Sequence, residues 1–457
     1  MPKQKKEAPD KSAPKKTEKR PAKLPDRILG TKDVLALEGR FWDFVQKKAQ
    51  DIAKGYSFSF VKTPIIESAD LYKKSLREET GHDLYHLECD RGEKGVLRPE
   101  MTQGMLRSYF QQPIEPGQSL PAVHSFSIGP VFRKERLQNG YFREFTQFDL
   151  EIIGEGQPMS EAILLVAAVN FFRELHIDVQ VQINSLGKPD CRKEYVKRLA
   201  EFYKERGRKS KLCNNCKKNL LKNPLALLDC REEECAKMKL EAPQIADYWS
   251  DESREHFKQV MEYLDELNIP YNFDPYLVRN LAYYNDTVFE IWPVGEDGKI
   301  QGKVSLAGGG RYDALSEQLA GQNVPAVGIA IGLERTVAKV KDKNIFLGDP
   351  DEELVFIAQL GIQAKLKALL LFEELRDAGL SVRQAFAVDS LKTQMEEAQQ
   401  LHARYSLIIG KKEVMDETIQ LRDMESGVQE VVAFKKIKEK LLKKINVNNR
   451  KEGGLYG

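Results

Sequence analysis

The stretch FREFTQFDLEIIG, residues 142–154, alternates side-chain character in the way that decides the fold of the larger part of this chain. Successive side chains of a β-strand point to opposite faces of its sheet, so the alternation predicts a strand with two different faces. One face would carry Phe142, Glu144, Thr146, Phe148, Leu150 and Ile152, and the other Arg143, Phe145, Gln147, Asp149, Glu151 and Ile153. The second face combines a cation, an aromatic ring, an amide and two carboxylates. Taken alone, it is equally typical of a sheet face exposed to water.

The sequence before this strand favours a binding site. In SFSIGPVFRKERLQNGYFREF, residues 125–145, two strands are joined by a long polar loop that contains the hairpin signal Asn139-Gly140. Arg133 and Arg136 lie at the mouth of this loop. Because arginine makes bidentate contacts with phosphate and carboxylates hold ammonium groups, the hairpin suits a zwitterion bound beside a polyphosphate.

Polar side chains also gather in RPEMTQG, residues 98–104, and in LVRNLAYYNDTVFEIW, residues 277–292. They lie too close together for an ordinary connection between a strand and a helix. The groups of interest are Arg98, Glu100, Thr102, Arg279, Tyr283 and Tyr284. We therefore expect both segments to contribute to a ligand site.

Two glycine-rich segments follow. SLAGGGRYDAL, residues 305–315, has three consecutive glycines, which allow a ligand to approach the backbone closely. AVGIAIGLER, residues 326–335, places Gly328 and Gly332 four positions apart. We interpret this spacing as tight packing of an apolar helix, which leaves the following Arg335 unexplained.

The composition predicts a soluble globular protein. The chain has 457 residues, of which 41% are hydrophobic and 31% charged, so two to four domains are expected. No apolar run is long enough to cross a bilayer and no signal peptide is recognisable, which favours a cytoplasmic protein without a membrane segment. The formal net charge of +2 means that any nucleic-acid contact depends on local patches.

Composition also divides the chain into segments. Residues 1–24 contain eight lysines, one arginine and three acids, which predicts a disordered basic tail. Residues 25–344 would form the main domain, with a Lys- and Glu-rich helical insertion at about 185–270. Strand and helix patterns alternate over residues 345–446, which is typical of an α/β domain, and residues 447–457 would be a flexible tail.

Two helices and one interrupted strand are among the other elements expected in the main domain. Apolar residues fall at helical spacing over residues 41–53, and residues 157–175 form the most convincing helix, with Ser160 and Glu161 in its first turn. SFSFVKTPIIES, residues 57–68, predicts a strand broken near Pro64.

Together these segments resemble the class II aminoacyl-tRNA synthetases, and within them the histidyl-tRNA synthetase family. FRKERLQNGYFREFTQFDLEIIG resembles motif 2 of the class, GIAIGLER resembles motif 3, and residues 41–66 would correspond to motif 1. LVRNLAYY with TVFE, and AGGGRYDAL, resemble two histidine-specific signatures. The resemblance covers about residues 25–445. It implies an α+β catalytic domain built on an antiparallel sheet, with flanking helices and a helical insertion, followed by a C-terminal α/β domain of the anticodon-binding type.

The resemblance implies a role for each matching side chain. The catalytic arginines would be Arg133, Arg279 and Arg335. Histidine would be bound by Glu100, Met101, Thr102, Arg133, Gln147, Glu151, Arg279, Tyr283 and Tyr284, with Glu151 and Tyr284 at the two imidazole nitrogens. ATP would be bound by Arg133, Glu135, Phe145 and Arg335, with Phe145 stacked on adenine. The sequence departs from the family's pattern at Asn280, Ala282 and Met101, and Tyr141 stands where an arginine is usual.

The implied reaction needs no side-chain nucleophile. L-Histidine would attack the α-phosphate of ATP, release pyrophosphate and form histidyl-adenylate, and histidine would then pass to the 3′ end of tRNA(His). Positioning and charge stabilisation would supply the catalysis, and Mg²⁺ would bridge the phosphates. The resemblance further implies a homodimer.

Two other functions compete with this one. The first is a catalytically inactive synthetase paralogue that acts as a regulatory or binding subunit, like the regulatory subunit of ATP phosphoribosyltransferase. Such paralogues lack the C-terminal domain and lose motif residues, whereas residues 350–445 and all three arginines are present here. The second is a class II synthetase for glycine, proline or threonine, which the segment from Arg279 to Tyr284 argues against.

Four of the six cysteines are clustered. Cys213 and Cys216 are separated by two residues, Cys230 follows after thirteen more, and four residues separate it from Cys235. Four thiolates at this spacing can form a closed tetrahedral zinc site, which would be structural because no coordination position stays open. The alternative is a set of reduced cysteines that happen to lie in a helical insertion. Both interpretations remain open from the sequence, because the second pair is spaced more widely than is usual.

Overall fold

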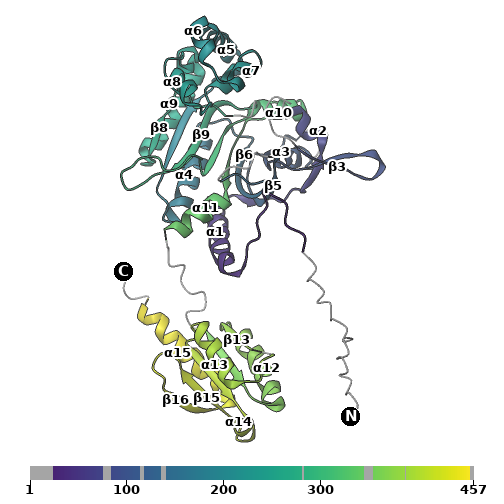
Figure 1. Cartoon of the computed structure of the whole chain (residues 1–457), viewed down its shortest axis with the longest axis vertical. Coiled ribbons are helices and arrows are strands. Elements are labelled where there is room, and N and C mark those ends of the chain that lie inside the picture. The colour runs from purple at the N-terminus through teal and green to yellow at the C-terminus, as the bar shows by residue number, and fades with distance from the viewer. Residues whose placement is uncertain are drawn as a thin grey trace, which may run out of the picture. The chain divides into compact units, whose positions relative to one another are not determined.

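The computed structural model describes residues 24–75, 84–113, 118–134, 140–279, 283–343, 354–385 and 387–452. The chain divides into two compact units, Met1–Asn344 and Ile345–Gly457, which we describe separately (Figure 1). The expected basic tail up to residue 23 lies outside the described residues, as do Glu135 and Arg136 of the hairpin loop.

An eight-stranded sheet forms the centre of the first unit. Its strands follow the order β1 (Ser59–Phe60), β5 (Val123–Phe132), β6 (Glu144–Ile153), β11 (Ala326–Gly332), β10 (Ala307–Arg311), β9 (Asn285–Pro293), β7 (Val179–Ser185) and β8 (Tyr271–Phe273). The inner pairs are antiparallel, which confirms the expected sheet, but β1 and β8 pair parallel with their neighbours. Long connections separate each of these edge strands from its partner in sequence: the segment with the small sheet and α2 and α3 before β5, and the helical insertion before β8. Long connections of this kind permit parallel pairing.

The hairpin of β5 and β6 confirms the two faces predicted for residues 142–154. Its register runs from Val123 opposite Ile153 to Phe132 opposite Glu144. On one face Phe148 is fully buried, and its ring centroid lies 5.4 Å from that of Phe171. The opposite face presents Gln147 and Glu151 to the functional site described below.

Helices cover both faces of this sheet. The helices α1 (Ala36–Gly55), α4 (Met159–Glu174) and α11 (Leu333–Asp342) pack together on the Phe148 face, and α4 confirms the helix predicted over residues 157–175. The helix α3 (Thr102–Phe110) packs on the other face, next to α10 (Asp313–Ala320) and α2 (Ala69–Ser75). A small sheet lies beside them, in the order β2 (Ile66–Ser68), β4 (Lys94–Leu97) and β3 (Tyr85–Glu88). Within the described ranges no helix is both long and apolar enough to span a bilayer.

The helical insertion expected between two strands of the sheet is present. Between β7 and β8 the chain forms α5 (Pro189–Lys204), α6 (Arg206–Lys211), α7 (Asn214–Lys222), the 3₁₀ helix η3 (Pro224–Leu227), α8 (Glu233–Lys239), the 3₁₀ helix η4 (Ile245–Tyr248) and α9 (Asp251–Glu266). Figure 1 shows α5 to α8 gathered at one end of this unit, beyond β8 and β9. The last helix, α9, returns along α4.

The second unit is an α/β domain, as expected. Its sheet has the order β13 (Val382–Gln384), β12 (Val355–Gln359), β14 (Tyr405–Ile409), β15 (Thr418–Asp423) and β16 (Gln429–Ala433). The first three strands are parallel and the last two antiparallel. Its helices are α12 (Ile362–Asp377), α13 (Leu391–Gln400), α14 (Lys411–Met415) and α15 (Ile437–Glu452). Because α15 continues to Glu452, the helical structure extends beyond residue 446, where we expected a flexible tail to begin.

Candidate active site

A cavity of about 140 Å³ lies against the face of the sheet that carries Gln147. The start of α3, the loop end of the β5–β6 hairpin, the strands β10 and β11 and the start of α11 surround it. Nine of the predicted site residues line it: Glu100, Thr102, Arg133, Phe145, Gln147, Arg279, Tyr283, Tyr284 and Arg335. Segments that are far apart in the sequence therefore meet in one cavity.

Two of the three predicted arginines are held in place by backbone carbonyls. Arg133 donates to the Pro99 carbonyl at 2.8 Å, and its guanidinium lies 5.2 Å from the Phe145 ring centroid and 4.0 Å from the Glu100 carboxylate. Arg335, in the first turn of α11, donates to the carbonyls of Gly140 and Ser305 at 3.1 and 2.8 Å. These contacts fix each guanidinium at the cavity wall.

The third arginine, Arg279, forms an ion pair with Glu290 of β9. Glu290 pairs with Gly308 of β10 in the sheet, and a Cβ at position 308 would lie 2.5 Å from Arg279 Nη1. A side chain at this position would displace the guanidinium. The glycine-rich segment of β10 thus gives room to a protein side chain, Arg279, in addition to any ligand.

Two buried carboxylates accept hydrogen bonds from tyrosine hydroxyls. Tyr283 donates to Glu100 at 2.8 Å, and Tyr312 donates to Glu151 at 2.5 Å. Thr102 also donates to Glu151, at 2.7 Å. Burial raises the pKa of Glu151 to about 8, although the two hydroxyls act in the opposite direction. Burial likewise raises the pKa of Glu100, against the attraction of Arg133.

Several predicted residues lie elsewhere than expected. Met101 does not line the cavity, because its side chain is fully buried against Met105 and Val131. Glu151 lies beneath the lining, behind the hydroxyls of Thr102 and Tyr312. The predicted ATP ligand Glu135 lies outside the described residues.

The sequence analysis did not assign roles to three residues that complete the site, Tyr312, Glu290 and Glu334. Tyr312 lines the cavity, and its ring centroid lies 6.0 Å from that of Tyr283. Glu334 accepts two hydrogen bonds from the Thr146 amide, at 2.8 and 2.9 Å, and burial raises its pKa to about 7. The alternation of strand β9 would have pointed to Glu290, and the position of Tyr312 directly after β10 would have pointed to Tyr312, had the strand order been known.

The glycine pair of residues 326–335 was interpreted wrongly. Both Gly328 and Gly332 belong to strand β11, and the helix α11 starts only at Leu333. A Cβ at position 328 would lie 1.6 Å from the Glu151 carboxylate, so this glycine makes room for that carboxylate instead of for a helix contact.

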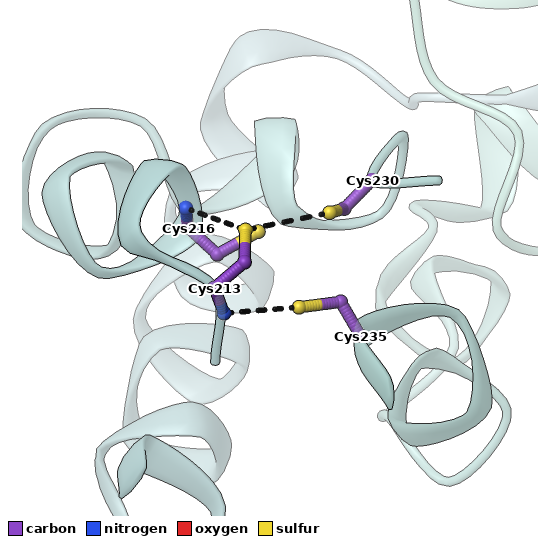
Figure 2. Close-up of side chains that lie close together, drawn as sticks. All are labelled: Cys213, Cys216, Cys230 and Cys235. Carbon is purple, nitrogen blue, oxygen red and sulfur yellow. Dashed lines mark hydrogen bonds between the residues drawn. The ribbon is translucent and has the colours of Figure 1, made fainter. Parts of the chain in front are cut away.

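The four clustered cysteines lie together outside this cavity, in the insertion (Figure 2). Their sulfur atoms all lie within 4.8 Å of one another. The arrangement is separate from the arginines and carboxylates described above, and its chemistry is considered below.

Comparison with known proteins assigns the family. A family model described as histidyl-tRNA synthetase matches residues 30–336, and one described as anticodon binding domain matches residues 354–444. The curated histidine–tRNA ligase of Thermosipho melanesiensis is 37% identical over 408 residues, which are 88% of this chain and 95% of the relative. That of Clostridium novyi is 35% identical over 415 residues, 90% of this chain and 97% of the relative.

Solved structures agree with this assignment. The crystal structure of apo S. aureus histidyl-tRNA synthetase matches with a TM-score of 0.74 and 29% identity, over 92% of this chain and 100% of the other. A Bacillus halodurans structure described as an ATP phosphoribosyltransferase regulatory subunit/histidyl-tRNA synthetase has a TM-score of 0.58 at 17% identity, which shows a shared fold alone. The family model covers more than half of the chain and the curated relatives align over nearly their whole length. The chain therefore belongs to the histidyl-tRNA synthetase family.

Proposed function

We propose that this chain is a histidine–tRNA ligase, which activates L-histidine with ATP and transfers it to the 3′ end of tRNA(His). The observation that carries the proposal is the composition of one cavity. It combines three arginines, which suit the phosphates of ATP, with the buried carboxylate of Glu100, and a second buried carboxylate, Glu151, lies directly beneath its lining. The two carboxylates suit the two nitrogen-bearing ends of histidine.

Glu100 receives the α-ammonium group of histidine. Its carboxylate is buried, is oriented by the Tyr283 hydroxyl, and lies at the N-terminal end of α3 next to Thr102. A buried carboxylate is costly without a positive partner, so an ammonium group is favoured at this position. Gln147 also lines the cavity, and it lies on the face of β6 that carries Glu151. Its amide completes the end of the pocket that receives the ammonium group.

Glu151 recognises the imidazole ring. Thr102 and Tyr312 fix its two oxygens, so the carboxylate can accept an N–H from the ligand only in a narrow range of directions. We assign the other ring nitrogen to the Tyr284 hydroxyl, because Tyr284 lines the same cavity. Amino acids without an N–H at this position would bury the Glu151 carboxylate without the hydrogen bond that the ligand supplies, which is an effective basis for discrimination.

The arginines stabilise charge during adenylate formation. An oxygen of the histidine carboxylate bonds to the α-phosphorus as the bond to the bridging oxygen breaks, and the electron pair leaves with pyrophosphate. Arg279 and Arg133 face the α-phosphate, Arg335 holds the outer phosphates, and Phe145 stacks on adenine. ATP enters as its Mg²⁺ complex, because phosphate oxygens are the hard ligands that Mg²⁺ prefers.

Transfer follows when the terminal ribose hydroxyl of tRNA attacks the carbonyl carbon of the adenylate and AMP leaves. The second unit, which matches the anticodon binding domain, would bind the anticodon of the same tRNA. We further propose that the protein acts as a homodimer in the cytoplasm, as the resemblance to class II synthetases implies.

The regulatory-paralogue alternative is less well supported. Arg133, Arg279 and Arg335 are all present and all line the cavity, and residues 354–444 match the domain that such paralogues lack. Three arginines that converge on one cavity are explained by phosphate binding and are not needed in a protein that does not bind ATP.

ATP–pyrophosphate exchange tests the proposal directly. Exchange is measured with each of the twenty amino acids, using the wild type and Arg279→Lys, which keeps the charge but loses the planar fork. We expect exchange with histidine alone, reduced at least about 100-fold in the variant. Folded wild-type protein that exchanges with no amino acid would exclude the ligase function, and exchange with another amino acid would move the chain to a different specificity.

A further inference from the structure

The insertion contains a cluster of four cysteines that the proposed reaction does not use. Cys213 precedes α7 and Cys216 lies in its first turn, whereas Cys230 follows η3 and Cys235 lies in α8. Figure 2 shows the four side chains converging from these elements on one point. Cys216 and Cys235 are buried, and Cys213 and Cys230 are partly exposed.

The distances fit metal coordination. Four sulfurs at about 2.3 Å from a zinc ion form a tetrahedron whose edges are about 3.8 Å. The Sγ atoms of Cys213 and Cys230 lie 3.8 Å apart, and no pair in the cluster exceeds 4.8 Å. A disulfide would bring two sulfurs to about 2.05 Å, and all four cysteines are free thiols in the structure.

The surroundings of the sulfurs also suit thiolates. The backbone amide of Cys216 donates to Cys213 Sγ at 3.4 Å, and the amide of Cys213 donates to Cys235 Sγ at 3.4 Å. Such outer hydrogen bonds orient and stabilise ligating sulfurs. A surface hollow next to the cluster is lined by Cys213 and Cys230 together with two basic and two acidic side chains, and it gives a metal ion an entry path.

We propose that Cys213, Cys216, Cys230 and Cys235 bind one structural Zn²⁺ ion that braces the insertion. The helices α6, α7 and α8 have only six, nine and seven residues, and α6 buries none of them. Helices this short gain little stability from their own packing. A metal cross-link between α7 and α8 therefore supplies stability to the insertion that its small core cannot provide.

The braced helix α8 also supports the proposed active site. Tyr276 donates its hydroxyl to the carbonyls of Leu240 and Ala242, at the end of α8, and it lies three residues before Arg279. Cys216 and Cys235 belong to one buried cluster with Leu277, Tyr283 and Tyr312. Loss of the metal therefore weakens the support of the Arg279 segment. This consequence rests on the proposed function, whereas the metal site itself does not.

Metal content of the full chain tests the site. The protein is purified with a reductant and without chelator, and zinc is measured by elemental analysis. We expect one zinc ion per chain in the wild type and in the control Cys191→Ser, whose thiol lies outside the cluster and donates to the Lys188 carbonyl. Cys213→Ser and Cys235→Ser should lose the metal, and trypsin should then cleave the Lys-rich segment from α6 to α8 more rapidly.

Two measurements on the wild type keep the test decisive if a variant does not fold. A mercurial reagent should release the zinc as four thiols are modified, and metal-free protein reconstituted with Co²⁺ should show the strong charge-transfer and d–d bands of a tetrahedral four-thiolate site. Wild-type protein that contains no zinc and gives no such cobalt spectrum would overturn the proposal, as would a Cys213→Ser variant that keeps its full metal content. Histidine-dependent exchange without zinc would leave the ligase function standing, so the two proposals fail separately.

Discussion

Gly328 of β11 lies directly opposite Glu151 of β6, at a position where a Cβ would stand 1.6 Å from the Glu151 carboxylate. The carboxylate therefore lies across the neighbouring strand and not beside it. This arrangement places Glu151 under the hydroxyls of Thr102 and Tyr312, and it depends on the absence of a side chain at position 328. The pair links a backbone requirement of the sheet to the proposed recognition of imidazole.

Gly328→Ala is expected to reduce histidine-dependent ATP–pyrophosphate exchange at least about 100-fold, because the added methyl group displaces Glu151 by an ångström or more. The matched control is Gly332→Ala, four residues further along. A Cβ there would meet its nearest atoms at 3.7 and 3.8 Å, in ordinary contact, so exchange should change only a few-fold. Equal activity of the two variants would show that Glu151 does not need its present position.

The pH dependence of stability reports on Glu151. Its pKa is about 8 in the folded protein, above the ordinary value of 4.5, so the folded state binds the proton more tightly than the unfolded state. Its stabilising contribution is complete below about pH 4.5 and is lost as the pH rises toward 8, at up to about 1.4 kcal/mol per pH unit. Glu151→Gln lacks this loss, so its free energy of unfolding should increase relative to the wild type as the pH rises.

Tryptophan fluorescence provides the measurement, because all three tryptophans, Trp42, Trp249 and Trp292, lie in the first unit. Urea unfolding at pH 5, 6.5 and 8 should give a difference between variant and wild type that grows with pH. The exposed substitution Glu266→Gln serves as the control. A difference that stays constant over this range would contradict the raised pKa of Glu151.

The ion pair with Glu290 should orient Arg279 for the reaction, and a substitution of Glu290 tests this role. Glu290→Gln removes the charge that orients Arg279, while Trp292 can still donate its indole N–H to the amide oxygen at position 290. We expect the exchange rate to fall about 10- to 100-fold, because the guanidinium is no longer held toward the α-phosphate. Trp292→Phe removes the other donor to Glu290 and leaves the ion pair with Arg279. The exchange rate of this variant should therefore be markedly higher than that of Glu290→Gln. A Glu290→Gln variant with the wild-type rate would mean that the packing over Gly308 is sufficient to orient Arg279.

Local patterns in the sequence predicted the strands and helices that carry the site. The alternation in residues 142–154 identified both faces of β6, because the two-residue period of a strand is a property of the segment itself. It failed for residues 326–332, where β11 is buried on both faces and reads as a continuous apolar run, which periodicity cannot distinguish from a buried helix. Met101 was assigned to the site from the family resemblance. Its side chain does not line the cavity, because packing against Met105 and Val131 sets its direction.

The contacts that complete the site could not be predicted from sequence because they depend on strand order. Glu290 reaches Arg279 only because β9 and β10 are neighbours with Glu290 in register with Gly308. Tyr312 reaches Glu151 only because β10 lies next to β11, which in turn lies next to β6. Neither adjacency follows from any local pattern in the sequence. The family resemblance, in contrast, identified the three arginines without knowledge of the strand order.

Tyr141 stands where the resemblance to the family implies an arginine, and the structure gives it a specific neighbour. Its ring centroid lies 5.2 Å from the guanidinium carbon of Arg335, a cation–π distance. We infer that the ring orients Arg335 toward the outer phosphates of ATP. Tyr141→Ala should therefore raise the KM for ATP about 3- to 10-fold, in line with a contact of roughly 0.5–1.5 kcal/mol, and leave the KM for histidine nearly unchanged.

Two further variants distinguish the effect of the aromatic ring on ATP binding from the effects of its hydroxyl group and of a positive charge at position 141. Tyr141→Phe keeps the aromatic face and should behave as the wild type, whereas Tyr141→Arg replaces the stacking contact with a second cation facing the phosphates. If the ring acts only by orienting Arg335, then Tyr141→Ala should have little additional effect in an Arg335→Ala background, because the group that it orients is already absent. Additive losses in that double variant would show that Tyr141 contacts ATP on its own account, and the departure from the family's arginine would then be a replacement of one nucleotide contact by another.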